Sequence, residues 1–183
     1  NLWAPRGAII LSGTQALVRL MLMQRRLDAA QGWNTRGFIS GYRGSPLGMV
    51  DQVIWKQGKR LSEAGIEFVP AVNEELGATQ VLGTQRVESD PARTVDGVFG
   101  LWYGKGPGVD RAGDALKHGN AYGSSPHGGV VVVAGDDHGC VSSSMPHQSD
   151  QAFISWRLPV VSPADGLHYR WPDLPSLRIE SRL

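Results

Sequence analysis

The stretch Gly129-Val-Val-Val-Val-Ala134 decides the fold class of this sequence. A continuous apolar run of this kind is typical of a parallel strand that is buried on both faces. Working outward from it, weaker strand patterns occur at residues 7–11, 37–40, 66–69, 95–100 and 158–161. They alternate with helical patterns, and this alternation predicts an α/β domain with a mostly parallel central sheet flanked by helices.

The expected helices begin and end at residues that commonly cap helices. Ser12 or Thr14 is suited to cap a helix that continues to about Ala30, and Gly32 is suited to end it. Asn73 is a similar cap for a helix that reaches about residue 83. Two more helices are expected at about residues 50–61 and 110–122, which completes the alternation with the strands.

Composition and charge exclude several classes of protein. The 183 residues suffice for one domain with a buried core, and the net charge of +1 gives no electrostatic reason to expect nucleic acid or a membrane surface as a partner. No apolar run approaches the roughly 18–20 residues of a membrane span. The single cysteine, Cys140, cannot form a disulfide within the chain or supply a cysteine-based zinc or iron–sulfur site.

Polar loops follow the expected strands, at the place where open α/β sheets bind ligands. In the loop at residues 41–48, Arg43 and Ser45 are suited to bind a carboxylate and a hydroxyl group, although the same residues suit a simple turn. The glycine-rich segment at residues 104–108 is suited to bind an anion or to form a tight turn around Pro107. It matches neither of the common phosphate-binding motifs.

Two acidic segments allow both a functional and a structural interpretation. Glu74 and Glu75 follow Asn73, where they could stabilise a helix start or place a carboxylate beside a heterocyclic nitrogen. The segment at residues 135–140 contains Asp136, Asp137 and further possible metal ligands. Its spacing matches no zinc or EF-hand template, so no metal site is assigned to it.

A longer motif narrows these alternatives. Residues 96–111 read DGVFGLWYGKGPGVDR, and this segment resembles the N-terminal part of fused indolepyruvate ferredoxin oxidoreductases, which belong to the 2-oxoacid:ferredoxin oxidoreductase family. The resemblance extends over about residues 7–164. The other segments that carry it are residues 14–19, 23–26, 38–48, 72–75, 125–129 and 135–138.

The resemblance implies a thiamine diphosphate-binding fold, with a pyrimidine-type domain at residues 1–164 and a divergent, weakly structured tail at residues 165–183. Glu74 would be the catalytic carboxylate that bonds the aminopyrimidine ring, with its neighbour Glu75 as the alternative. The other implied site residues are Gly104, Lys105 and Gly106 for the cofactor, and Arg43 and Ser45 for the substrate. Because the family has further domains, the chain is expected to be a fragment that ends before its fold is complete.

The implied reaction is the oxidative decarboxylation of an aryl 2-oxoacid to an acyl-CoA, with electrons passed to ferredoxin. Another domain would hold Mg²⁺ at the shared cofactor site, and missing segments would carry the iron–sulfur clusters. The implied complete enzyme is a cytoplasmic homo-oligomer, whereas the isolated chain is expected to be inactive and to expose Trp102 and Tyr103. The alternative is a nonenzymatic α/β ligand-binding or assembly module that retains the fold.

Overall fold

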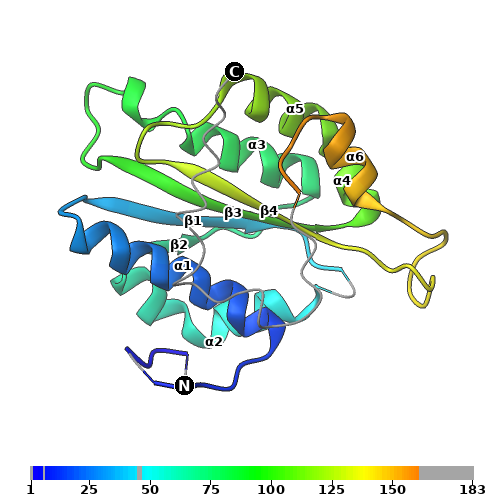
Figure 1. The fold of residues 1–183 in the computed structure, drawn as a ribbon, viewed down its shortest axis with the longest axis horizontal. Coiled ribbons are helices and arrows are strands. Elements are labelled where there is room, and N and C mark those ends of the chain that lie inside the picture. Colours follow the sequence, from blue (N-terminus) through cyan, green and yellow to red (C-terminus); the bar gives the residue numbers. More distant parts are fainter. Residues whose placement is uncertain (1, 6, 45–46, 161–183) are drawn as a thin grey trace.

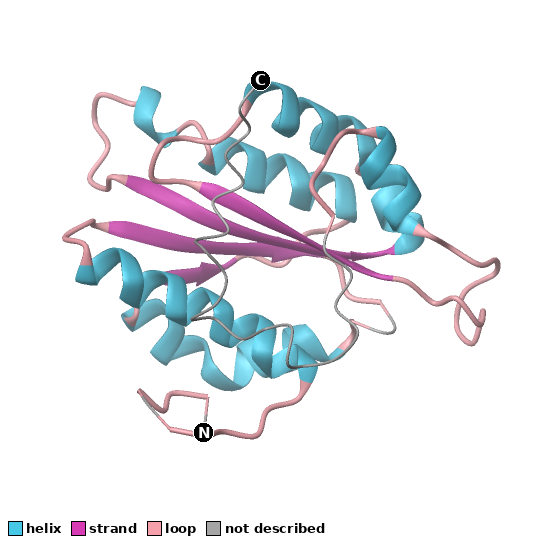
Figure 2. Ribbon diagram, in the orientation of Figure 1, coloured by secondary structure: helices cyan, strands magenta, loops and turns pink. Residues whose placement is uncertain are grey.

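The computed structural model describes residues 2–5, 7–44 and 47–160, and the following account is confined to them. A parallel sheet of four strands lies between two layers of helices (Figures 1 and 2). The strand order is β2-β1-β3-β4, and the strands are β1 (Thr35–Gly41), β2 (Ile66–Phe68), β3 (Gly97–Lys105) and β4 (Gly129–Gly135). This architecture confirms the predicted α/β class and the parallel central sheet.

The helices divide between the two faces of the sheet. On one face lie α1 (Gly13–Ala30) and α2 (Met49–Glu63). The other face carries α3 (Glu74–Thr84), α4 (Gly106–Arg111), α5 (Gly113–Tyr122) and α6 (Ser149–Ser155), and a 3₁₀ turn, η1 (Val87–Ser89), precedes β3 (Figure 1). None of the described helices combines the length and the apolar character needed to cross a bilayer.

Each face of the sheet has its own hydrophobic core. The core under α1 and α2 contains Val18, Ile54 and the β1 residue Ile39. The core on the opposite face contains Val81 of α3 and Phe153 of α6. Strand β1 lies between β2, which pairs with one of its edges, and β3, which pairs with the other. The order of the strands along the chain therefore changes direction at β1. The carboxyl ends of β1 and β3 therefore form the switch point at which α/β sheets usually bind ligands.

The predicted helix boundaries with local capping signals are confirmed. Ser12 caps α1, and its side chain and that of Gln15 form a reciprocal capping box. Gly32 follows the helix with a φ of +84°, a left-handed conformation that glycine adopts without strain. The Asn73 side chain accepts a hydrogen bond from the backbone N–H of Leu76 and caps α3.

Three expected strands differ from the structure. Residues 7–11 form no strand, and Ile10 is almost fully exposed there. Residues 158–160 form no strand because the chain turns at Arg157 and Leu158 packs onto the core beside α6. The strand expected at residues 95–100 begins at Gly97 and continues to Lys105, since its pairing with β1 and β4 extends through the glycine-rich segment.

Two further expectations are corrected by the packing. In the described part of the chain β4 lies at the edge of the sheet, so residues 129–134 are half-buried rather than enclosed on both faces. The helix expected at residues 110–122 is two helices separated at the buried Ala112. Helix α6 was not expected, and the tail at residues 165–183 lies outside the described residues.

Candidate functional site

The carboxyl ends of β1 and β3 bring several of the expected site residues together. A Cβ atom built on Gly44 would lie 3.4 Å from the Cβ of Lys105, so the loop after β1 contacts the end of β3. A Cβ atom built on Gly108 would lie 2.3 Å from the Cγ of Glu74, so the start of α3 contacts α4. Ser45, the other expected substrate residue, lies outside the described residues. These contacts define a candidate site at the switch point of the sheet.

Glu74 is the first residue of α3 and is half-buried, whereas Glu75 is exposed. Its side chain lies against the backbone of Gly108, where no larger residue would leave it room. None of the described residues forms a hydrogen bond or an ion pair with the Glu74 carboxylate. This carboxylate thus lies at the edge of the sheet and is available to a polar ligand. The start of the helix is already capped by Asn73, so capping does not account for the position of the Glu74 carboxylate.

Trp102 fixes the position of Glu74 through the backbone. The indole is wholly buried in the core beside α3, and its Nε1–H donates a hydrogen bond of 3.0 Å to the carbonyl oxygen of Glu74. On the same helix, Gly77 packs so close to Gly41 that a Cβ on Gly77 would lie 3.3 Å from the Gly41 Cα. The start of α3 is therefore held against both β1 and β3. The expectation that Trp102 is exposed was wrong, because the strand that contains it is central.

The expected loop at residues 104–108 is also corrected. Gly104 and Lys105 are the last residues of β3, and Gly106 begins α4 directly. The glycines allow close packing: a Cβ on Gly104 would lie 2.5 Å from the Trp102 ring, and one on Gly106 would lie 2.3 Å from the His147 Cβ. The segment is therefore a strand-to-helix junction rather than a loop, and its contact with an anion or a cofactor stays a prediction.

The loop after β4 folds back over this junction. The Lys105 Nζ donates a hydrogen bond of 3.0 Å to the carbonyl oxygen of Ser142. The His147 Nε2 lies 2.9 Å from a carboxylate oxygen of Asp110 in α4. Both contacts join the loop at residues 136–148 to residues at or just beyond the end of β3. The loop therefore forms one wall of the candidate site.

Asp136 and Asp137 organise this loop internally. Asp136 accepts hydrogen bonds from the backbone N–H and the hydroxyl of Ser149, at 2.7 and 2.6 Å. Asp137 accepts hydrogen bonds from the backbone N–H groups of Ser142 and Val141. These bonds lower the pKa of Asp137 to about 2, and the bond from Ser142 has the larger effect. Among the described residues no three histidine, cysteine or acidic side chains are grouped as metal ligands.

Tyr103 and Asp51 form a buried pair that the sequence analysis missed. The Tyr103 hydroxyl donates a hydrogen bond to the Asp51 carboxylate in the first turn of α2. Burial raises the pKa of Tyr103, as do the hydrogen bond to Asp51 and its charge, while the charge of Arg43 acts in the opposite direction. Tyr103 was expected to be exposed and is wholly buried, because it faces the core under α1 and α2.

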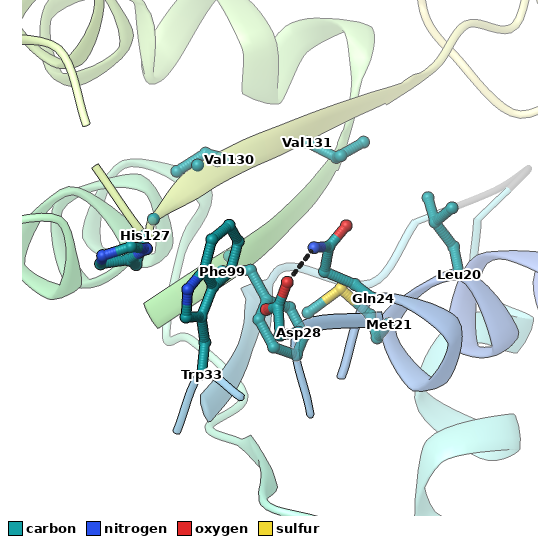
Figure 3. A pocket seen from close by; sticks show the side chains of 12 residues that line it. Leu20, Met21, Gln24, Asp28, Trp33, Phe99, His127, Val130 and Val131 are labelled. Carbon is teal, nitrogen blue, oxygen red and sulfur yellow. Dashed lines mark hydrogen bonds between the residues drawn. The ribbon is translucent and has the colours of Figure 1, made fainter. Parts of the chain in front are cut away.

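A small pocket lies at the other end of the sheet, near the start of β4 (Figure 3). Leu20, Met21, Phe99 and Val131 form apolar walls, and the rings of Trp33 and His127 lie 4.6 Å apart at its rim. Asp28 accepts a hydrogen bond from Gln24, as Figure 3 shows. None of the site residues expected from the sequence lines this pocket, so it is separate from the candidate site.

Comparisons with known proteins give one structural likeness. No protein-family model and no curated protein matches the chain. The fold is similar to a 2-oxoglutarate:ferredoxin oxidoreductase from Magnetococcus marinus, whose structure contains 2-oxoglutarate, coenzyme A and succinyl-CoA. The TM-score is 0.47 and the sequence identity is 21%, over 71% of this chain and 18% of that chain. The chain spans less than a fifth of that protein's length.

Proposed function

We propose that this chain is the pyrimidine-type thiamine diphosphate domain of a 2-oxoacid:ferredoxin oxidoreductase of the indolepyruvate type. The observation that carries the proposal is the half-buried Glu74 carboxylate, which stands at the switch point of the sheet and has no polar partner among the described residues. A carboxylate in this place is suited to bond a ring nitrogen of the aminopyrimidine. The motif at residues 96–111 supports the same assignment, because its residues build the strand-to-helix junction against which Glu74 rests.

The residues at this edge fit such a cofactor in their chemistry. When bound, thiamine diphosphate supplies a carbon nucleophile that adds to the carbonyl of a 2-oxoacid and retains the electron pair after decarboxylation. Glu74 would hold a proton at the interface with the ring nitrogen. Gly104, Lys105 and Gly106 would contact the cofactor, and the packing of Trp102 against Gly104 and of His147 against Gly106 would hold this backbone in place.

Arg43 would bind the carboxylate of the 2-oxoacid, and Ser45 would contact the substrate from the same loop. A guanidinium group is suited to this task because its planar fork matches the two oxygens of a carboxylate. Arg43 is exposed beside the end of β3, so its side chain is accessible to a small anion. The aryl character of the substrate rests on the sequence resemblance.

The remaining parts of the reaction would come from other segments. The chain has one cysteine, so the iron–sulfur centres that pass electrons to ferredoxin would lie elsewhere. The diphosphate and its Mg²⁺ would be held by another domain at a shared site, with coenzyme A as the acyl acceptor. The chain alone would then be inactive, as one wall of a site that needs its partner domain.

Glu74→Gln in the complete enzyme tests this proposal. The variant keeps the size of the side chain and removes the acid, so we expect turnover to fall by at least ~100-fold, the scale of positioned proton transfer. Glu75→Gln is the matched control, because Glu75 is exposed on the same helical turn, and it should leave turnover nearly unchanged. Normal turnover in Glu74→Gln together with an inactive Glu75→Gln would contradict the proposal and assign the catalytic role to Glu75.

A further inference from the structure

Tyr103 contacts the segment that carries Arg43 at two points. The Tyr103 carbonyl oxygen accepts a hydrogen bond of 3.1 Å from the backbone N–H of Tyr42. Its ring packs against Gly41 so closely that a Cβ there would lie 2.7 Å from the ring Cδ1. The segment at residues 41–44 therefore leaves β1 along the surface of this one tyrosine.

The same side chain also holds the far end of the connection between β1 and α2. Its hydroxyl donates to Asp51, which lies in the first turn of α2 and is only 4% exposed. Tyr103 itself is 0% exposed, so water does not replace either partner of this bond. A buried carboxylate is costly without a hydrogen-bond donor, and the tyrosine hydroxyl is that donor here. Tyr103 thus joins the start of the connection to the start of the following helix.

A second buried bond of the same chemistry provides a comparison within the molecule. At the opposite end of the sheet, the Thr35 hydroxyl donates to the carboxylate of Asp28 at 2.5 Å. That bond joins β1 to α1, and both residues are buried. It spans no part of the segment at residues 41–44. The two bonds differ in what they connect, although each pairs a hydroxyl with a buried carboxylate.

We propose that Tyr103 and Asp51 are positioning residues that hold the segment at residues 41–44 at the carboxyl edge of the sheet, so that Arg43 meets an anionic ligand there. The charge of Arg43 acts on the Tyr103 hydroxyl, which places the guanidinium in the electrostatic surroundings of the buried pair. The identity of the ligand, a 2-oxoacid carboxylate, rests on the proposed function. The positioning itself does not, because it follows from the contacts of Tyr103.

Residue-resolved amide hydrogen exchange of the full chain tests the positioning. In Tyr103→Phe, which removes only the hydroxyl, we expect the amide of Tyr42, whose N–H donates to the Tyr103 carbonyl oxygen, to exchange about tenfold faster. Thr35→Val is the matched control, because it removes the other buried hydroxyl–carboxylate bond, and it should leave the Tyr42 amide unchanged. Unchanged exchange at Tyr42 in Tyr103→Phe, or equal acceleration in both variants, would overturn the proposal.

A second variant keeps the test valid if Tyr103→Phe fails to fold. The double substitution Tyr103→Phe with Asp51→Leu leaves no buried carboxylate without a partner, so the fold should persist. It still lacks the bond to α2, and the amide of Tyr42 should again exchange about tenfold faster. Asp51→Asn retains an oxygen that accepts the tyrosine hydroxyl and should keep exchange at Tyr42 slow. Fast exchange in Asp51→Asn, or slow exchange in the double variant, would contradict the positioning role.

Kinetics of the complete enzyme separate this inference from the proposed function. Tyr103→Phe should raise the KM for the 2-oxoacid by about tenfold, with kcat changed less than twofold and the KM for thiamine diphosphate unchanged. A uniform loss of kcat would indicate general damage and would count against positioning. If exchange at Tyr42 accelerates while the KM for the 2-oxoacid stays constant, the positioning stands and carboxylate binding by Arg43 is overturned.

Discussion

Trp102 and Tyr103 are consecutive residues of β3, and both are wholly buried, yet they serve opposite faces of the sheet. The Trp102 indole donates to the backbone carbonyl of Glu74, and the Tyr103 hydroxyl donates to the side chain of Asp51. A pleated strand sends successive side chains to opposite faces, so two adjacent residues fix two helix starts. One central strand thereby aligns the two halves of the candidate site.

Trp102 and Tyr103 stabilise the two halves of the candidate site through different interactions. On the Trp102 side the acceptor is a neutral carbonyl, and most of the stabilisation comes from the large apolar ring. On the Tyr103 side the acceptor is a buried carboxylate, so a single hydroxyl determines whether a charge is satisfied. We therefore expect changes of volume to matter most for Trp102 and loss of one hydrogen bond to matter most for Tyr103.

The largest expected effect is on the Trp102 side. Trp102→Ala removes a buried ring and should lower the free energy of unfolding by about 3–5 kcal/mol. Trp55→Ala is the control, because Trp55 is 54% exposed on α2 and its loss should change stability by only about 0.5 kcal/mol. Urea denaturation of the chain measures both values. Similar losses of free energy of unfolding in the two variants would contradict this prediction, because burial of the ring would then not explain the contribution of Trp102 to stability.

A smaller effect sharpens the link between this side and Glu74. Gly108→Ala would place a Cβ where the Glu74 side chain now lies, so the carboxylate should be displaced with little loss of fold. We expect turnover of the complete enzyme to fall by about 10–100-fold, as for a misplaced reacting group. Gly119→Ala in α5 is the control, because its new methyl would meet only Leu82 at 3.5 Å. Full activity of Gly108→Ala would show that the position of Glu74 is not critical.

The smallest expected effect concerns the loop that covers the end of β3. Because folding lowers the pKa of Asp137 from 3.8 to about 2, this residue supports the loop fully above pH 3.8 and loses that contribution as the pH falls through about 2. The protection factors of the Val141 and Ser142 amides, measured against their intrinsic exchange rates, should therefore be high at pH 4 and fall near pH 2. In Asp137→Asn this pH dependence should disappear. Persistence of the same profile in the variant would assign it to another group.

The features that the sequence predicted are those set by local chemistry. Ser12 and Asn73 cap helices through bonds to the residue three positions away, and the four consecutive valines of β4 favour a strand through their branched side chains. Glu74 was placed at the sheet edge for the same reason, since an Asn-Glu pair after a strand marks a helix start. These signals are complete within a few residues.

The features that the sequence could not predict depend on distant partners. The glycines at residues 104–108 were expected to form a loop, but Gly106 is required by His147, which lies far along the chain. In the sequence, Asp51 is an ordinary acidic residue in the first turn of a helix, and its buried hydrogen bond with Tyr103 is apparent only from the packing of α2 against β3. The edge position of β4 follows from the order of the strands, which no single strand encodes. Packing across the sheet, rather than local propensity, decides these three features.

The direct passage from β3 into α4 has a further consequence. Lys105 ends the strand and Gly106 begins the helix, so no connecting residue intervenes between the two elements. Backbone torsions at this junction are set by a sheet ladder on one side and by helical hydrogen bonds on the other. Ligands that bind against flexible segments must first restrict those segments, at a cost in conformational entropy. A molecule that binds against this junction would meet backbone that is already ordered, and more of its contact energy would remain as affinity.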